Sequence, residues 1–175
     1  MEEKIFMEGI TICDNPLRAR GLRSKEFDAE GIATKELKLV EDGRLKMWLL
    51  DLRSARQLNL KTNGHASRGT TSPPSPSATN LYMEPGKDSP LELIGNIDNG
   101  FYVTEMIGMG VDGVTGDYSR GATGYWIENG KITYPVSEMT IAGNLNEMFR
   151  NLTPANDLSF RFATNCPTVR IDSLT

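Results

Sequence analysis

The chain has 175 residues, a length typical of one domain and large enough to bury a core without a disulfide or a metal. Its formal net charge of −4 disfavours a protein that binds DNA through a basic face. The sequence contains a single histidine, His65, and therefore excludes any site built from two or more histidines.

Turn residues dominate the chain, which has 17 glycines and 9 prolines. Asp42-Gly43 separates two strand-like segments, residues 35–40 and 44–50. Because this dipeptide readily adopts the left-handed conformation of a tight turn, it predicts a β-hairpin. Asn129-Gly130 predicts a second hairpin in the same way, between residues 125–128 and 131–136.

Three short helices are expected. Residues 52–60 have an amphipathic face, and Ser89-Pro90 is a favoured helix start, with Gly100 closing that helix. Asn144 is a suitable cap for a third helix over residues 145–152.

Further strands are expected at residues 101–107, 158–163 and 168–171. The elements together predict one α+β domain over residues 1–175, in which β structure dominates. We expect antiparallel sheets in a barrel- or sandwich-like arrangement with two or three short helices.

Residues 64–78 form a segment rich in Gly, Ser, Thr and Pro, which indicates either a mobile linker or a functional loop. Residues 108–113 spell G-x-G-x-x-G, but the glycines that follow are incompatible with the helix that a dinucleotide site needs. We interpret residues 108–113 as a glycine turn or as a strand closely approached by another backbone.

Candidate catalytic groups are sparse. His65, Asp117 and either Ser67 or Ser119 would supply the residue types of a serine hydrolase, although the pattern G-x-S-x-G is absent. Turn-forming serines explain the same positions.

The potential metal ligands are widely spaced. Cys13 and Cys166 stand far apart, no two ligands share a short stretch, and no self-contained zinc site is expected. The spacing favours two reduced thiols. Without a signal sequence or a long apolar run, the chain is expected to be cytoplasmic.

The order of the motifs resembles the C-terminal domain of the TldD/PmbA family, the so-called modulators of DNA gyrase, and within it the PmbA (TldE) branch. The resemblance covers nearly the whole chain. It is carried by PLRARGL at 16–22, FDAEG at 27–31, LLDLRSAR at 49–56, GHASRG at 64–69, TNLYMEPG at 79–86, TGDYSRGATGYWIENG at 115–130, YPV at 134–136 and TIAGNL at 140–145.

This resemblance implies a β-rich domain whose N-terminal companion is absent from the chain. It implies a role in a metallopeptidase complex that acts on unfolded peptides, with zinc only in a TldD-type partner and no zinc motif here. The partner is a TldD-type subunit or a second copy of the chain, with no direct contact to nucleic acid or membrane.

No residue of this chain is expected to be catalytic under the resemblance. The residues expected to line a peptide-holding lumen are His65, Ser67, Arg68, Asp117, Ser119, Arg120 and Gly121. Two alternatives remain: an autonomous serine-type hydrolase that uses Ser119 or Ser67 with His65, and a non-enzymatic interaction module.

Overall fold

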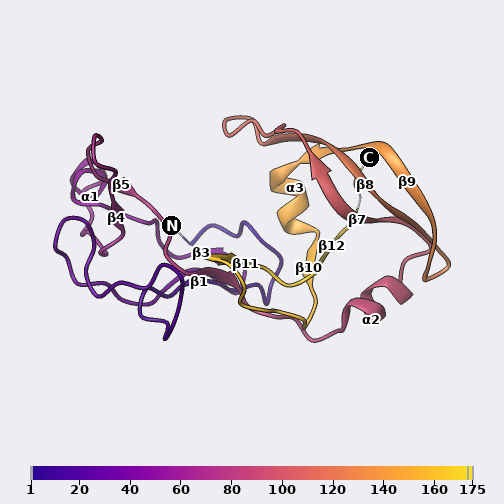
Figure 1. Ribbon diagram of the computed structural model, residues 1–175, viewed down its shortest axis with the longest axis horizontal. Coiled ribbons are helices and arrows are strands. Elements are labelled where there is room, and N and C mark those ends of the chain that lie inside the picture. Colours follow the sequence, from indigo (N-terminus) through magenta and orange to yellow (C-terminus); the bar gives the residue numbers. More distant parts are fainter. Residues whose placement is uncertain (1, 173, 175) are drawn as a thin grey trace. The chain divides into compact units, whose positions relative to one another are not determined.

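The computed structural model describes residues 2–172 and 174, which form two compact units (Figure 1). Unit 1 comprises Met1–Lys4, Glu8–Glu84 and Leu158–Pro167, and unit 2 comprises Ile5–Met7, Pro85–Asp157 and Thr168–Thr175. The expectation of a single domain over residues 1–175 stays a prediction.

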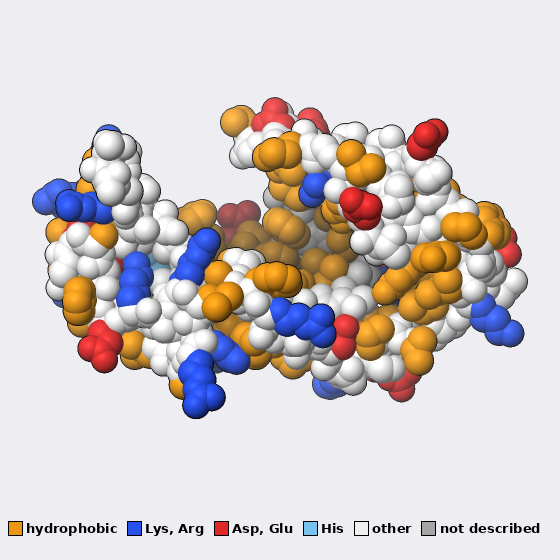
Figure 2. All heavy atoms as spheres, in the orientation of Figure 1, with side chains coloured by type: hydrophobic (Ala, Val, Ile, Leu, Met, Phe, Trp, Pro, Cys, Tyr) orange, Lys and Arg blue, Asp and Glu red, His pale blue; other side chains and the backbone are white. Residues whose placement is uncertain are grey.

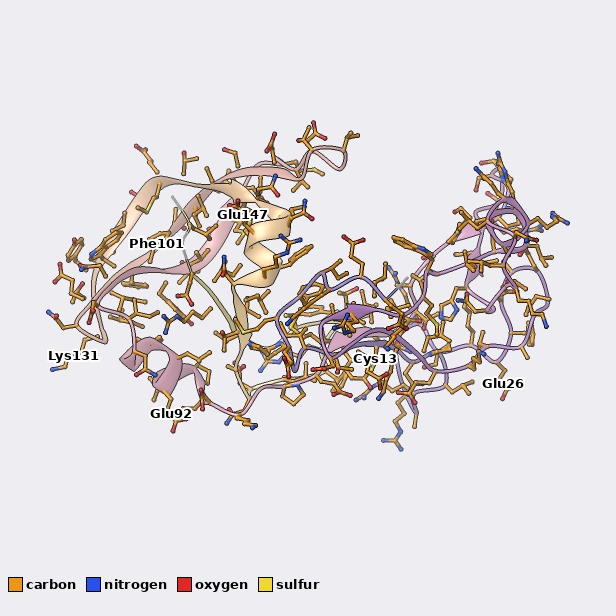
Figure 3. All side chains as sticks on the ribbon, turned by 180° about the vertical axis from the view of Figure 1, so that it is seen from behind. Cys13, Glu26, Glu92, Phe101, Lys131 and Glu147 are labelled. Carbon is orange, nitrogen blue, oxygen red and sulfur yellow. The ribbon has the colours of Figure 1, made fainter. Side chains whose placement is uncertain are left out.

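Unit 1 is built around a five-stranded sheet with the order β11-β6-β1-β2-β3. Adjacent strands of this sheet run antiparallel, except that β11 runs parallel to β6. The side chain of Cys13 lies on this sheet (Figure 3) and is buried with Leu37 and Val40. The strands are β1 (Ile12–Asp14), β2 (Leu37–Glu41), β3 (Arg44–Leu45), β6 (Leu81–Met83) and β11 (Thr164–Asn165).

In addition to this sheet, unit 1 contains α1 (Leu52–Gln57) and a two-stranded ladder of β4 (Ala66–Ser67) and β5 (Ser75–Pro76). The Gly- and Ser-rich segment at residues 64–78 therefore folds back on itself as a small paired structure.

Unit 2 contains a three-stranded antiparallel sheet in the order β7-β8-β9. Its strands are β7 (Asn99–Ile107), β8 (Asp117–Glu128) and β9 (Lys131–Asn144). The remaining elements are α2 (Pro90–Gly95), α3 (Leu145–Arg150), β10 (Leu152–Pro154) and β12 (Val169–Ile171), of which β10 and β12 pair with each other.

Both predicted hairpins form. Asp42 and Gly43 have φ of 51° and 72°, and Asn129 and Gly130 have φ of 49° and 74°. These left-handed pairs make the primed turn that matches the twist of the strands. Lys131 lies at the second turn (Figure 3). After the first turn, only residues 44–45 of the expected strand 44–50 are paired.

The three predicted helices are present, each with six residues. Asp51 and Ser89 form capping boxes with Ser54 and Glu92, and Asn144 accepts a hydrogen bond from the backbone N–H of Asn146. All three helices end earlier than expected, at Gln57, Gly95 and Arg150. After α1 the chain leaves the helical conformation at Asn59, which has φ of 54°.

The expected strand at residues 158–163 is wrong, since these residues lie in a loop. The side chain of Asn165 holds the loop: its Oδ1 accepts from the backbone N–H groups of Arg161 and Phe162, and its Nδ2 donates to the carbonyl of Phe162. A side chain thus takes the backbone groups that a neighbouring strand would otherwise pair with.

Two glycines allow close approach of neighbouring backbones in unit 2. A Cβ at Gly110 would lie 1.7 Å from the carbonyl oxygen of Ser119, and one at Gly124 would lie 2.0 Å from that of Tyr102. Residues 108–113 form no strand, but the backbone at Gly110 is closely approached by that of β8.

The prediction of a β-dominated α+β fold with short helices is confirmed, and over residues 2–172 and 174 the sheets form no closed barrel. Within this described part, no helix has the length and apolar character needed to cross a membrane.

Candidate functional site

His65 lies in the interior of unit 1, with no exposed surface. Its Nε2 is 2.8 Å from Oδ2 of Asp14, which is also fully buried, and its Nδ1 is 2.9 Å from the carbonyl oxygen of Asn63. Both ring nitrogens are therefore occupied by partners within unit 1.

Both oxygens of the Asp14 carboxylate accept hydrogen bonds in the same network. Oδ1 accepts from the backbone N–H of Thr79 at 2.8 Å, and Oδ2 accepts from the Thr79 hydroxyl at 2.6 Å as well as from His65. Both ring nitrogens of His65 already have partners, so neither is available to a serine hydroxyl. The geometry therefore opposes the serine hydrolase alternative for both Ser67 and Ser119.

Ser67 and Arg68 follow the buried Ala66 in unit 1, and both are exposed. Ser67 is paired with Ser75 across the β4–β5 ladder. The carbonyl of Ala66 accepts a hydrogen bond from Nζ of Lys25 at 3.0 Å, which places a cation beside this ladder.

The other sequence candidates lie at the start of β8 in unit 2. Asp117 accepts hydrogen bonds from the hydroxyl of Thr115 and from Nδ2 of Asn144, so its carboxylate organises the loop before β8. Ser119 donates its backbone N–H to the carbonyl of Gly110.

Successive side chains of a strand point to opposite faces, and the β8–β9 register is regular from Asp117 to Ala122. Asp117, Ser119 and Gly121 therefore share one face, and Arg120 lies on the other. Asp117 and Arg120 therefore do not point to the same face of β8, as they would have to in order to bind the same part of a peptide. Nε of Arg120 is buried and has no hydrogen-bond partner among the described residues.

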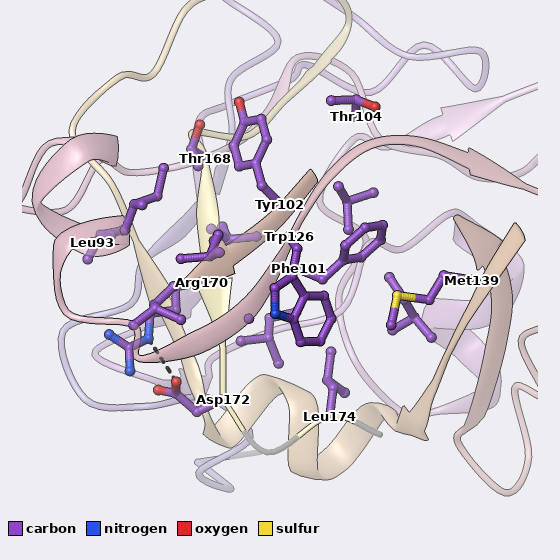
Figure 4. Close-up of a pocket in the computed structure, with 18 of the residues that line it drawn as sticks. Leu93, Phe101, Tyr102, Thr104, Trp126, Met139, Thr168, Arg170, Asp172 and Leu174 are labelled. Atoms are coloured by element: carbon purple, nitrogen blue, oxygen red, sulfur yellow. Dashed lines mark hydrogen bonds and ion pairs between the residues drawn. The ribbon is translucent and has the colours of Figure 1, made fainter. Parts of the chain in front are cut away.

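Unit 2 contains a pocket of about 690 Å³ (Figure 4). Its walls include the aromatic rings of Phe101 and Trp126, whose centroids are 6.5 Å apart, and Leu93 of α2. At one side, Nε of Arg170 donates to Asp172 at 2.7 Å. The pocket is mainly apolar with one charged pair on its wall.

Two strand edges border this pocket. Every residue from Asn99 to Met106 of β7 lines it, and so does every residue from Thr168 to Asp172, which includes β12. Because alternate side chains point to opposite faces, an unbroken run of lining residues means that each strand faces the pocket with its edge. β7 is paired with β8 alone, so its outer edge is unpaired among the described residues.

Sequence reasoning found β7 as the strand at residues 101–107 but missed the pocket. Hydrophobic patterning finds a strand, whereas its position at the edge of a sheet depends on the pairing of distant segments. Arg170 and Asp172 carry no pattern that would associate them with residues 99–106. No signal in this single sequence could have identified the pocket.

The potential metal ligands among the described residues do not form a zinc site. Over the described residues, no three His, Cys, Asp or Glu side chains gather in a way that could hold a metal ion. The ring of His65 is engaged on both sides, and burial raises the pKa of the Cys13 thiol, which disfavours the thiolate that a metal requires.

Comparison with known proteins identifies the family to which the chain belongs. The model of the PmbA/TldA metallopeptidase C-terminal domain matches residues 1–175. The "Metalloprotease PmbA" of Escherichia coli O157:H7 is 41% identical over 174 residues, which is 98% of this chain and 36% of that protein. A "Metalloprotease TldD homolog" of Buchnera aphidicola (subsp. Schizaphis graminum) is 32% identical over 161 residues, 90% of this chain and 33% of that protein.

Solved structures agree with the sequence relatives. A protein named as a modulator of a DNA gyrase from Thermotoga maritima superposes with a TM-score of 0.85 and 34% identity, covering 99% of this chain and 40% of that one. TldE from Thermococcus kodakarensis superposes with a TM-score of 0.86 and 26% identity, covering 98% of this chain and 40% of that one. The chain thus spans well under half the length of these relatives. It belongs to the PmbA/TldD metallopeptidase family and corresponds to the C-terminal domain of that family.

Proposed function

We propose that this chain is the peptide-holding C-terminal domain of a PmbA/TldE-type subunit in a cytoplasmic metallopeptidase complex. In this proposal a TldD-type partner contributes the zinc, and the complex cleaves unfolded peptides. The similarity to proteins named PmbA, TldD and TldE supports membership of such a pair.

The observation that carries the proposal is the outer edge of β7. This edge offers nine residues without a proline, so every residue retains its backbone N–H. An extended peptide adds to such an edge as a further strand and obtains its affinity from main-chain hydrogen bonds. Binding of this kind needs no particular sequence, as suits a peptidase of unfolded chains.

The pocket beside the edge complements this mode of binding. Side chains of an added strand alternate between two faces, and those on one face would meet the apolar wall around Phe101 and Trp126. The outer edge of β9 is a poorer site, because Pro135 lacks an N–H and Glu138 has a left-handed φ of 57°.

Strand addition can be tested with N-methylated peptides. A fluorescent unstructured octapeptide is titrated into the purified chain and followed by anisotropy. Methylation of every backbone nitrogen removes the donors on both edges of the peptide and should abolish binding, whereas a peptide methylated on alternate nitrogens keeps one bonding edge and should still bind. Equal binding of the fully methylated and the unmethylated peptide would contradict strand addition.

The division of labour is tested by a peptidase assay. The chain alone should not hydrolyse peptides. A full-length PmbA-type subunit carrying this domain, combined with a TldD-type subunit, should hydrolyse them and lose activity with a chelator. Hydrolysis by the chain alone that survives the chelator and disappears in the His65→Ala variant would instead support the serine hydrolase.

A further inference from the structure

Unit 1 contains a second pocket, of about 480 Å³, whose chemistry differs from that of the apolar pocket. Its lining consists of two cationic side chains, Arg23 and Lys25, four hydroxyl side chains and one alanine. No carboxylate is among them. A polar pocket with two cations and no acid has the chemistry that binds an oxyanion.

The two cations have no acidic partner among the described residues. Over residues 2–172 and 174, neither Arg23 nor Lys25 forms an ion pair. Asp28 lies close enough for the charge of Lys25 to act on it. Its oxygens, however, are occupied by the backbone N–H groups of Glu30, Ile32 and Ala66. Figure 2 shows more Lys and Arg than Asp and Glu side chains over the part of unit 1 that carries α1, β4 and β5.

A buried network holds the walls of this pocket. Oδ1 of Asn80 accepts from the backbone N–H of Arg23 at 3.0 Å, and its Nδ2 donates to the Ser24 hydroxyl at 2.9 Å. Asn80 is 2% exposed, and the neighbouring Thr79 is fixed by Asp14. The pocket is therefore formed before a ligand arrives, which lowers the entropic cost of binding.

Three groups retain donors for a ligand. The guanidinium of Arg23 and the hydroxyl of Ser67 donate to no described residue, and Nζ of Lys25 uses one of its three N–H groups on the carbonyl of Ala66. The hydroxyls of Ser24 and Ser77 are already committed to backbone carbonyls.

We propose that this pocket binds an oxyanion through Arg23, Lys25 and Ser67. The proposal rests on the proposed function only for one source of the ligand, the carboxylate at the C-terminal end of a peptide. Inorganic phosphate has the same chemistry and is the second source. A planar guanidinium with an adjacent ammonium and hydroxyl suits either anion.

The test is a titration of the isotope-labelled chain followed by NMR, because amide shifts report both weak binding and correct folding. Three probes are used: inorganic phosphate, an octapeptide with a free C-terminal carboxylate, and the same peptide amidated. Phosphate, or the peptide with the free carboxylate, should change the NMR chemical shifts of the Lys25 and Ser67 amides. The amidated peptide should change them less. Binding should also weaken at high salt, since the pocket is open to solvent.

Arg23→Gln should weaken binding by about tenfold, the effect of losing one charge-assisted hydrogen bond. The control is Arg53→Gln, an exposed arginine on α1 outside the pocket, which should change affinity by less than about twofold.

The outcomes separate the two proposals. Selective binding of the free carboxylate that is lost in Arg23→Gln supports a peptide-terminus site, and phosphate binding with the same loss supports a phosphate site. If phosphate does not bind and both peptides bind alike, the oxyanion site is overturned while strand addition stands. Anion binding that is unchanged in Arg23→Gln overturns the site as well.

Discussion

The carboxylate of Asp28 stabilises its own loop, residues 28–32, and connects it to Ala66 at the start of β4. The group is 4% exposed, and burial alone would raise its pKa, but three backbone N–H donors outweigh burial and lower it. Because the folded pKa is depressed, its stabilising contribution is complete above the unfolded pKa of 3.8 and is lost as the pH falls through the lower folded value.

Asp28→Asn should therefore destabilise the chain at pH 7 by about 1–3 kcal/mol, because the amide cannot accept all three bonds. The free energy of unfolding, measured with urea at pH 7 and at steps down to about pH 2, should fall less steeply with acid in the variant than in the wild type. Parallel curves for the two proteins would contradict this assignment.

Asp14 and His65 form a buried pair whose role is structural. Asp14→Ala leaves the ring of His65 and the hydroxyl and backbone N–H of Thr79 without their acceptor. We expect a loss of about 3–5 kcal/mol in unfolding free energy, as for other buried pairs from which one partner is removed.

The matched control for Asp14→Ala is Ser67→Ala. Ser67 lies two residues from His65, but its side chain is exposed and its hydroxyl forms no hydrogen bond with a described residue, so we expect a change below about 0.5 kcal/mol. Thermal and urea unfolding of the two variants provide the comparison. A loss smaller than about 1 kcal/mol in Asp14→Ala would count against the structural role.

The candidate residues could be found in the sequence only as chemical types. Serine, histidine and aspartate in a glycine-rich context suggested a catalytic set. The sequence shows that these side chains exist, but it does not show whether the ring of His65 is already hydrogen-bonded to other residues. The burial of His65 follows from its contacts with Asp14 and Asn63, of which Asp14 is 51 residues away. The unpaired state of Arg23 likewise depends on which carboxylates folding brings near it.

At the scale of elements, local signals succeeded where the chemistry is local. Both hairpin turns and all three helix caps lie where turn and cap residues stand in the sequence. The lengths of β8 and β9 could not be predicted, because Gly121, Gly124 and Pro135 weaken the strand pattern. Pairing with neighbouring strands overrides that local preference.

Gly124 tests the close approach of β7 and β8. A methyl group there would meet the carbonyl oxygen of Tyr102 at 2.0 Å, so Gly124→Ala must separate the strands and should cost about 1–3 kcal/mol. Gly113→Ala is the control, because a Cβ at Gly113 would meet nothing within 4 Å and its φ is not left-handed. It should stay within about 0.5 kcal/mol of the wild type. Equal urea midpoints for both variants would contradict the close approach.

At the scale of the whole molecule, the chain passes more than once between the two compact units. The chain leaves unit 1 after Glu84 and returns to it for residues 158–167, where β11 pairs with β6. Strand β11 has only two residues, and its partner Leu81 is distant in sequence. No composition shift marks these crossings, so a single sequence indicates one β-rich chain without its subdivision.

The family name invokes DNA gyrase, and the charge of the molecule bears on direct contact with DNA. A net charge of −4 opposes approach to a polyanion, although Arg18, Arg20, Arg23 and Lys25 stand close together in unit 1. The guanidinium of Arg18 is stacked on Phe160, 3.4 Å from the ring centroid, and is thereby partly committed.

We therefore expect no binding of a duplex of about 20 base pairs with a Kd below about 10⁻⁴ M at physiological salt, the weak limit of non-specific DNA binding. Fluorescence polarisation across a range of salt concentrations provides the measurement. Micromolar binding with a steep salt dependence that Arg23→Gln reduces would show that the cations of unit 1 recognise phosphate in DNA. A basic cluster can hold one small oxyanion without neutralising a duplex, because duplex binding requires contacts to several phosphates at once and the acidic remainder of the chain repels them.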